Sequence, residues 1–111
     1  MEYNKVFSTR SARLRLSMHA KKITTTELSR KSKIDKYVIA AFLEDRKTPS
    51  IDECKAMATV LKVLPSWLAC IDNNTPLHVA LFHGRKIVSK EEWDPVLEYA
   101  DYIKDNYEKN D

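Results

Sequence analysis

Side chains that can bind an anion are concentrated in the first half of the chain. Residues 1–50 contain 12 Lys or Arg and 5 Asp or Glu, so their net charge is +7, whereas residues 51–111 contain 7 and 11, so theirs is −4. A basic surface attracts a polyanion such as a nucleic acid. Lysines and arginines that only solvate helix faces would give the same counts, so charge alone does not identify the partner.

The residue types that catalysis or metal binding needs are not arranged for either in this sequence. A single glycine in 111 residues argues against a glycine-rich phosphate loop, and neither a nucleophile elbow nor a pair of catalytic acids is apparent. Cys54 and Cys70 do not form a Cys-x-x-Cys pair, and the three histidines lack metal-ligand spacing. We therefore expect no enzyme, no metal site and no cofactor, and two free thiols that are at least partly buried.

Two short helices joined by a basic turn should position the basic side chains. The first should begin at Thr24, whose hydroxyl can accept from the Glu27 amide while the Glu27 carboxylate returns to Thr24 in a capping box. It should end near Lys31, and Lys33 and Ile34 then form the turn. The free amides at the start of this helix favour an anion.

The second helix of the pair should begin at Asp35, whose carboxylate suits both the N-cap position and the helix dipole. It should end before Pro49, because the residue that precedes a proline resists helix. Its core residues should be Val38, Ile39 and Phe42. The residues left for its outer face are Lys36, Tyr37, Ala40 and Ala41. Such a pair is typical of a helix-turn-helix, in which the second helix enters the DNA major groove.

Three further helices should surround this pair: one from about residue 9 to residue 21 or 22, one over residues 50–62, and a short one that follows it. A second capping box marks the start of the helix at 50–62, and Pro65 lies in the first turn of the short helix. Their predicted core residues are Ala12, Leu16 and Ala20, then Ile51, Cys54, Met57, Ala58 and Leu61, then Trp67 and Leu68. Arg10, Arg13 and Arg15 should lie largely outside the apolar face of the first helix.

The C-terminal third should contain one more amphipathic helix. Asp94 can cap it, with Pro95 at its first position and acidic residues between the apolar ones. Its apolar stripe consists of Trp93, Val96, Leu97, Tyr99, Ala100, Ile103 and Tyr107. The stripe could pack on the chain's own domain or form a dimer contact. We expect the dimer contact, because five helices already complete a core before Asp72.

The predicted organisation is an N-terminal arm at 1–8, a helix-turn-helix domain at 9–72, a connector at 73–92 and a C-terminal helix at 93–111. The connector should form either a short helix after Thr75-Pro76 or a hairpin that turns at His83-Gly84. The longest apolar run, at 38–43, is far short of the roughly 20 residues that span a membrane. Without a signal-peptide-like segment either, we expect a cytoplasmic protein.

Residues 12–70 resemble the Cro/C1-type helix-turn-helix family, the lambdoid phage repressors and their bacterial relatives. The matching positions, over nearly sixty residues, are Leu14, Ile23-Thr24, Glu27-Leu28, Ile39, Phe42, Pro49-Ser50 and Trp67-Leu68. The resemblance implies an all-α, five-helix, lambda repressor-like domain that binds DNA, here followed by a C-terminal amphipathic helical extension. Members of the family are often dimers on palindromic operators.

The resemblance also implies which residues contact DNA. Lys36, Tyr37, Ala40 and Ala41 take the base-contacting positions, where a lysine can donate to guanine O6 or N7 and a short side chain can touch a thymine methyl. The implied phosphate contacts are Thr24, Thr25, Lys33, Arg46, Lys47 and Thr48. Such phosphate contacts orient the protein without selecting a sequence.

The chain departs from the family pattern where relatives often have glycine. Lys22, Lys33 and Asp45 take those places, so either the turns differ or a cost of roughly 1 kcal/mol is accepted for each positive φ. Leu43 takes a position that is usually polar, so it should face a partner or the C-terminal segment.

The expected function is therefore that of a sequence-specific transcriptional regulator. The most plausible form is a phage or prophage repressor in a bacterial cell, associated with the nucleoid, which binds double-stranded operator DNA as a homodimer and is relieved by an antirepressor or another protein. The alternative is an antitoxin or adaptor whose acidic C-terminal helix binds a partner protein, with DNA binding secondary.

Overall fold

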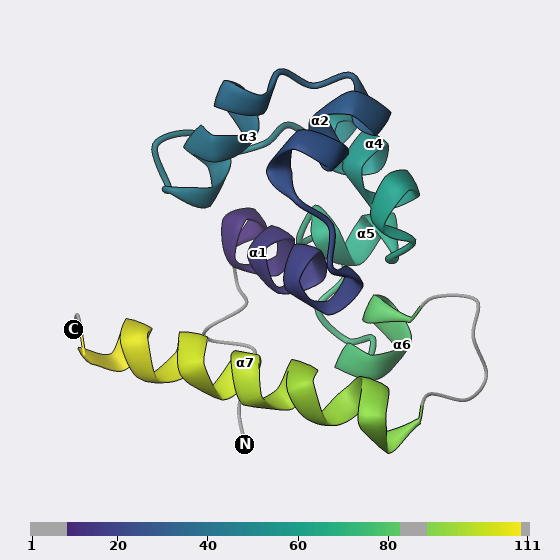
Figure 1. The fold of residues 1–111 in the computed structure, drawn as a ribbon, viewed down its shortest axis with the longest axis vertical. Coiled ribbons are helices and arrows are strands. Elements are labelled where there is room, and N and C mark those ends of the chain that lie inside the picture. Colours follow the sequence, from purple (N-terminus) through teal and green to yellow (C-terminus); the bar gives the residue numbers. More distant parts are fainter. Residues whose placement is uncertain (1–8, 83–88, 110–111) are drawn as a thin grey trace.

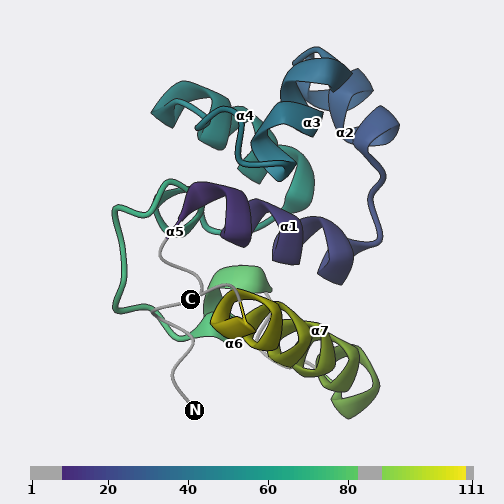
Figure 2. The same cartoon turned by 90° about the vertical axis from the view of Figure 1, so that its left-hand side faces the viewer.

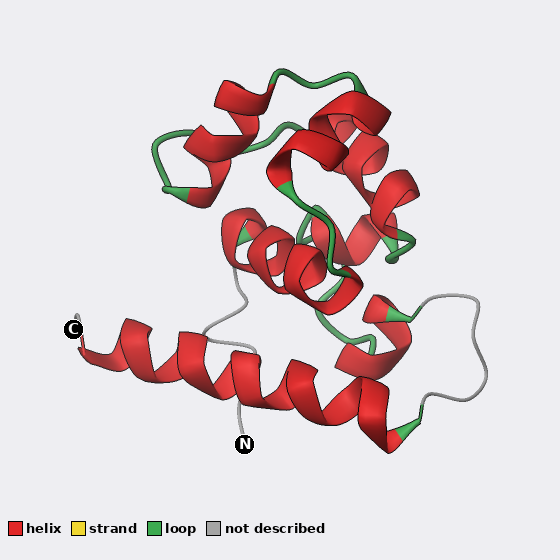
Figure 3. Ribbon diagram, in the orientation of Figure 1, coloured by secondary structure: helices red, strands yellow, loops and turns green. Residues whose placement is uncertain are grey.

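The computed structural model describes residues 9–82 and 89–109, and side chains within these ranges except those of His78 and residues 103–109. The described residues form seven helices and no strand (Figure 3). The helices are α1 (Arg10–Lys21), α2 (Thr25–Ser32), α3 (Lys36–Leu43), α4 (Ile51–Leu61), α5 (Pro65–Leu68), α6 (Leu77–Leu81) and α7 (Lys90–Lys109). The all-α prediction is confirmed. The arm at 1–8 and the turn at His83-Gly84 lie outside the described residues.

The helices are arranged in layers around α1. Helices α2 to α5 pack on one side of α1, and α7 crosses its other side together with α6 (Figures 1 and 2). Of the two alternatives for the connector, the short helix is present as α6, and the Leu64 amide donates to the Ala80 carbonyl at 2.9 Å, which ties α6 to the start of α5. No helix in the described part of the chain has the length and apolarity that a membrane span needs.

Capping side chains set the helix starts at the predicted positions. Thr9 caps α1, the Thr24 hydroxyl accepts from the Glu27 amide at 3.1 Å, and the Asp35 carboxylate accepts from the Tyr37 amide at 2.8 Å. Ser50 caps α4 in a complete capping box with its third helical residue. Each such cap stabilises a helix by about 1 kcal/mol. These contacts are local, which is why the sequence predicted them.

Helix ends without glycine adopt the left-handed conformation that glycine would allow. Lys22, Lys33 and Asp45 have φ of 54°, 65° and 59°, so the backbone cost is accepted and the turns are kept. Lys62 and Cys70, at 57° and 61°, do the same. The loops on both sides of α3 therefore contain the left-handed residue that glycine usually provides, here Lys33 and Asp45.

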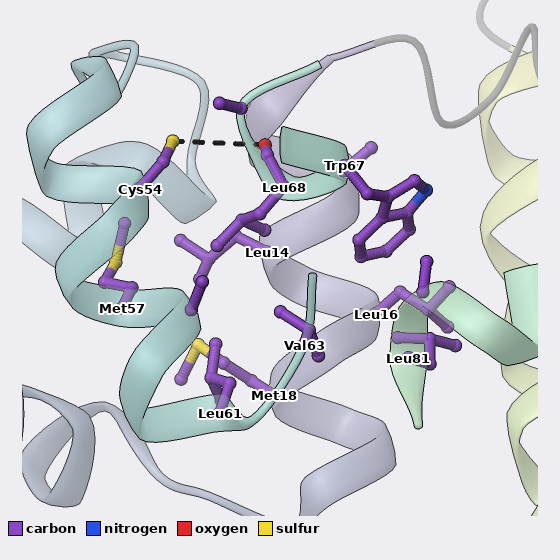
Figure 4. Close-up of a cluster of buried hydrophobic side chains, with 14 of the residues drawn as sticks. Leu14, Leu16, Met18, Cys54, Met57, Leu61, Val63, Trp67, Leu68 and Leu81 are labelled. Carbon is purple, nitrogen blue, oxygen red and sulfur yellow. Dashed lines mark hydrogen bonds between the residues drawn. The ribbon is translucent and has the colours of Figure 1, made fainter. Parts of the chain in front are cut away.

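All seven described helices contribute buried residues to one core, and Figure 4 shows the part of it where α1, α4 and α5 meet. Leu14, Leu16, Met57 and Leu68 are fully buried, as is Cys54, whose Sγ lies 3.9 Å from the Leu68 carbonyl oxygen. Burial raises the pKa of the Cys54 thiol to about 11, so it is neutral at pH 7. Both cysteines are free thiols, as predicted.

One predicted member of this core, Ile51, is wrong. Its side chain is 42% exposed. Ile51 is the first residue of α4, and the buried residues of this helix begin one turn later, at Cys54.

The predicted position of Arg13 outside the apolar face of α1 is also wrong. Its side chain is only 2% exposed and passes between α1 and α5. The guanidinium donates to the carbonyls of Trp67 (2.5 Å) and Asp72 (3.1 Å) and to Oδ1 of Asn73 (2.7 Å), and it lies 5.3 Å from the centre of the Trp67 ring. Burial lowers the pKa of Arg13 from its ordinary value. Arg13 therefore joins α1 to the end of α5 and is not available to DNA.

The last helix differs from its prediction in two respects. It begins at Lys90, with the Ser89 hydroxyl accepting from the Glu92 amide at 3.3 Å, so Pro95 lies inside the helix and Asp94 is not its cap. Val96 and Ala100 are buried in the monomer core.

Most of the described part of the α7 stripe faces α1. Trp93 and Tyr99 pack against the core, Leu97 is half-buried, and the side chains of Ile103 and Tyr107 lie outside the described residues. The expectation that Val96 and Ala100 form a dimer contact is wrong. The face of α1 that points away from α2 and α3 is itself apolar, and these two residues of α7 are buried against the chain's own core.

Candidate nucleic-acid interface

Helix α3 exposes its first turn while its middle is anchored in the core. Ile39 and Phe42 are fully buried, and Val38 packs against the core beside them. Lys36 is exposed and Tyr37 is 74% exposed, so both side chains extend from the anchored helix into solvent. A rigid helix that presents two hydrogen-bonding side chains is the arrangement that base contact in a groove requires.

Lys36 and Tyr37 are also in contact with each other. The Lys36 ammonium lies 5.5 Å from the centre of the Tyr37 ring, within the range of a cation–π interaction. The Asp35 cap holds the Tyr37 amide, so the backbone from which both side chains extend is fixed. The pair therefore offers an ammonium, a phenol and an aromatic face at one end of α3.

The two alanines predicted for base contact lie deeper than expected. Ala40 is half-buried, and Ala41 is only 8% exposed, so the predicted outward position of Ala41 is wrong. The chain after α3 folds back over this residue, and the Arg46 and Lys47 amides both donate to the Ala41 carbonyl, at 2.9 and 3.3 Å. The positive φ of Asp45 makes this tight return possible.

The side chains predicted to contact phosphates flank α3 on both sides. Five of the six are exposed and Thr25 is half-buried; the exposed ones are Thr24, Lys33, Arg46, Lys47 and Thr48. They belong to the start of α2, the turn before α3 and the loop after it. Backbone amides and the dipole at the start of α2 add a favourable environment for an anion.

Arg46 already has an acidic neighbour. Its Nε lies 2.7 Å from Glu44 Oε2, and both side chains are about three-fifths exposed. A pair this exposed contributes little to stability, so it can open when a phosphate approaches. Lys33 and Lys47, which are exposed, are therefore the simpler candidates for phosphate contact in this region.

Three arginines of α1 were not recognised from the sequence as internal hydrogen-bond donors. Arg10 donates to the carbonyls of Ala69 (2.9 Å) and Pro49 (2.7 Å), Arg13 to those at the end of α5, and Arg15 to that of Leu43. These bonds span 28 to 60 residues of sequence, so no local pattern could indicate them. The arginines of α1 are thus engaged in internal hydrogen bonds, whereas Arg30, Lys33, Lys36, Arg46 and Lys47, on and around α2 and α3, are exposed.

The acidic C-terminal helix lies on the far side of α1 from α3. Helix α7 crosses the face of α1 opposite to α2 and α3 (Figures 1 and 2). The acidic residues of α7 therefore do not face the exposed start of α3. The start of α3 therefore lies on the side of α1 that α7 does not cover.

Comparison with known protein families finds a match for the region that contains α2 and α3. Residues 13–66 match the family model of the Cro/C1-type HTH DNA-binding domain, which here extends from α1 into α5 and includes α2 and α3. No curated protein and no solved structure is significantly similar to the chain.

Proposed function

We propose that this protein, whose residues 13–66 form a Cro/C1-type helix-turn-helix DNA-binding domain, is a sequence-specific transcriptional repressor of phage or prophage type that binds a palindromic operator as a homodimer. The observation that supports this most is the exposure of Lys36 and Tyr37 at the start of α3, beside the basic side chains of Lys33 and Lys47. The acidic helix α7 lies on the other side of the molecule. An antirepressor that binds the protein would relieve repression.

In this proposal α3 enters the major groove with its N-terminal turn foremost. Lys36 donates to guanine O6 or N7, and Tyr37 contacts a neighbouring base edge or phosphate. Ala40 lies next along the helix and, being short, allows close approach. Lys33 on one side and Lys47 on the other contact phosphates and fix the orientation of α3.

A dimer needs a contact surface other than the buried stripe of α7. An apolar groove of about 310 Å³ lies between the first turn of α4 and the end of α5, and its edges carry Ile51 and Ile71, which are 42% and 62% exposed. The molecule measures 36 × 33 × 24 Å, which is the scale of one turn of DNA (roughly 34 Å), the spacing of half-sites for such dimers. We place the second copy at this groove.

Replacing Ile71 with glutamate is expected to dissociate the dimer. The carboxylate would replace an apolar contact at the two-fold interface with a charge that must lose its water, which should raise the dimer dissociation constant at least about tenfold. Sedimentation velocity over a range of protein concentrations measures this change. Val79→Glu is the matched control, since Val79 is 44% exposed but lies outside the groove. Equal association of the two variants would exclude this groove as the dimer contact.

Selection of binding sites from random duplex DNA tests the proposal as a whole. The expected result is a palindromic consensus whose half-sites are centred about 10 base pairs apart, because a two-fold dimer imposes its symmetry on its site. A consensus with one half-site only would contradict the dimer. A failure to enrich any sequence at moderate salt would contradict sequence-specific binding, since non-specific contacts alone weaken steeply with salt.

A further inference from the structure

A cavity of about 650 Å³ separates part of α7 from the helix-turn-helix domain. It lies between the second half of α1, the end of α3 and the first half of α7. Its apolar lining includes Met18, Leu43, Phe82 and Val96, of which Met18, Phe82 and Val96 are nearly or fully buried. Its volume falls within the range of small-molecule sites in proteins, about 300 to 1,000 Å³.

The two walls of this cavity have opposite charge. Arg15 and Lys22 line it from the side of α1, and Glu91 and Glu92 line it from α7. The Arg15 guanidinium donates to the Leu43 carbonyl, which fixes it at the wall. Helix α7 supplies no basic residue to the lining. A ligand with one charge would be attracted by the wall of opposite charge and repelled by the wall of the same charge.

Stacked rings from α1 and α7 also line the cavity. The His19 and Tyr99 rings are 3.8 Å apart and nearly parallel, at 9°. Phe82 lies at the end of α6, with its ring 6.1 Å from that of Trp93. The cavity therefore combines apolar and aromatic walls with one cationic and one anionic side.

We propose that this cavity binds a small zwitterion with an aromatic body, of which an aromatic α-amino acid is the simplest example. The carboxylate of such a ligand pairs with Arg15 and Lys22, and its ammonium pairs with Glu91 and Glu92. Its ring packs against the apolar lining. Both charges of the ligand are then matched, whereas an analogue with one charge leaves one wall unsatisfied.

Such a ligand would also affect DNA binding, and this part of the inference rests on the proposed function. Thr24 and Leu43 line the cavity as well; Thr24 is the cap of α2 and a proposed phosphate contact, and Leu43 is the last residue of α3. A ligand that shifts either residue changes the position of the DNA-binding helices. By linkage, DNA then changes the affinity for the ligand by the same factor.

Isothermal titration calorimetry on the full chain without DNA tests the site itself. The probes are L-tryptophan, tryptamine, which lacks the carboxylate, and indole-3-propionate, which lacks the ammonium. L-Tryptophan is expected to bind at least about tenfold more tightly than either analogue, because each analogue can make only one of the two charge-assisted pairings. Equal binding of all three, or no heat from L-tryptophan at millimolar concentration, would overturn the proposal.

Two substitutions with matched controls locate the binding. Glu91→Gln should weaken L-tryptophan about tenfold without weakening indole-3-propionate, whereas Glu98→Gln, exposed on α7 but outside the cavity, should leave both unchanged. Ala20→Leu should narrow the cavity and weaken L-tryptophan binding, whereas Ala56→Leu on α4 should not. Circular dichroism shows whether each variant is folded. Binding that survives both Glu91→Gln and Ala20→Leu in folded protein would place the ligand elsewhere.

The effect on DNA is measured separately. The expected result is a change of at least about fivefold in operator affinity at saturating L-tryptophan, a typical coupling. Binding of L-tryptophan without any change in DNA affinity would overturn the regulatory step while leaving the site. Failure to select an operator would overturn the proposed function and leave the calorimetric result standing.

Discussion

Replacing Lys36 with alanine is expected to weaken binding to the selected operator by about 2 to 6 kcal/mol over the two half-sites, since a good base contact contributes about 1 to 3 kcal/mol. Binding to random duplex DNA should change far less, because Lys36 lies at the exposed start of α3, where it can reach a base edge. Fluorescence anisotropy with the selected operator and a scrambled duplex measures both affinities at one salt concentration.

Lys47→Ala is the control for this prediction. Lys47 is equally exposed but lies in the loop after α3, where the proposed contact is a phosphate. Its removal should weaken both duplexes alike and lower the slope of log affinity against log salt by about one for each phosphate that is no longer neutralised. If Lys36→Ala also weakened both duplexes alike, Lys36 would be a phosphate contact and base selection would belong to Tyr37 or Ala40.

Local chemistry explains what the sequence predicted correctly. Thr24, Asp35 and Ser50 cap helices through bonds to amides two or three residues away, so each is visible in a short stretch of sequence. Apolar residues at helical spacing likewise identified Ile39 and Phe42 as the buried side of α3. Because Ile39 and Phe42 define the buried side of α3, Lys36 and Tyr37 were correctly predicted to be exposed.

Long-range contacts explain what the sequence did not predict. Helical spacing shows that α7 has an apolar stripe, but it does not show whether Val96 and Ala100 meet another chain or α1. In the structure they meet α1, whose apolar side is wide enough to contact α4 and α7 at once. Ala41 was misplaced because the return of the chain at Asp45 depends on a backbone conformation that a non-glycine residue seldom adopts.

Loss of α7 would therefore expose the apolar face of α1 that α7 covers. A truncation after residue 72 would uncover apolar residues of α1, such as Leu16, which is fully buried and lies close to α6 in the core (Figure 4). Single surface substitutions on α7 are a cleaner way to ask what its outer face does. The same reasoning makes α7 part of the folding unit that holds α3 in place.

Arg13→Ala is expected to lower the free energy of unfolding by about 2 to 4 kcal/mol, a large fraction of the roughly 5 to 15 kcal/mol of a small domain. The guanidinium is buried and donates to three oxygens, on Trp67, Asp72 and Asn73. Alanine would leave the carbonyls of buried Trp67 and half-buried Asp72 without their donor, and it would also remove the interaction with the Trp67 ring. Urea unfolding followed by tryptophan fluorescence measures the change.

Arg30→Ala is the matched control, because Arg30 is an exposed arginine on α2 and its removal should change stability by less than about 0.5 kcal/mol. Arg13→Lys should be nearly as destabilising as Arg13→Ala, since one ammonium cannot reproduce the planar fork that reaches Trp67, Asp72 and Asn73 together. Equal stability of Arg13→Lys and the unaltered protein would mean that buried charge, and not this geometry, is what joins α1 to the end of α5. If Arg13→Ala were as stable as the unaltered protein, the hydrogen bonds of Arg13 to Trp67, Asp72 and Asn73 would contribute nothing to stability.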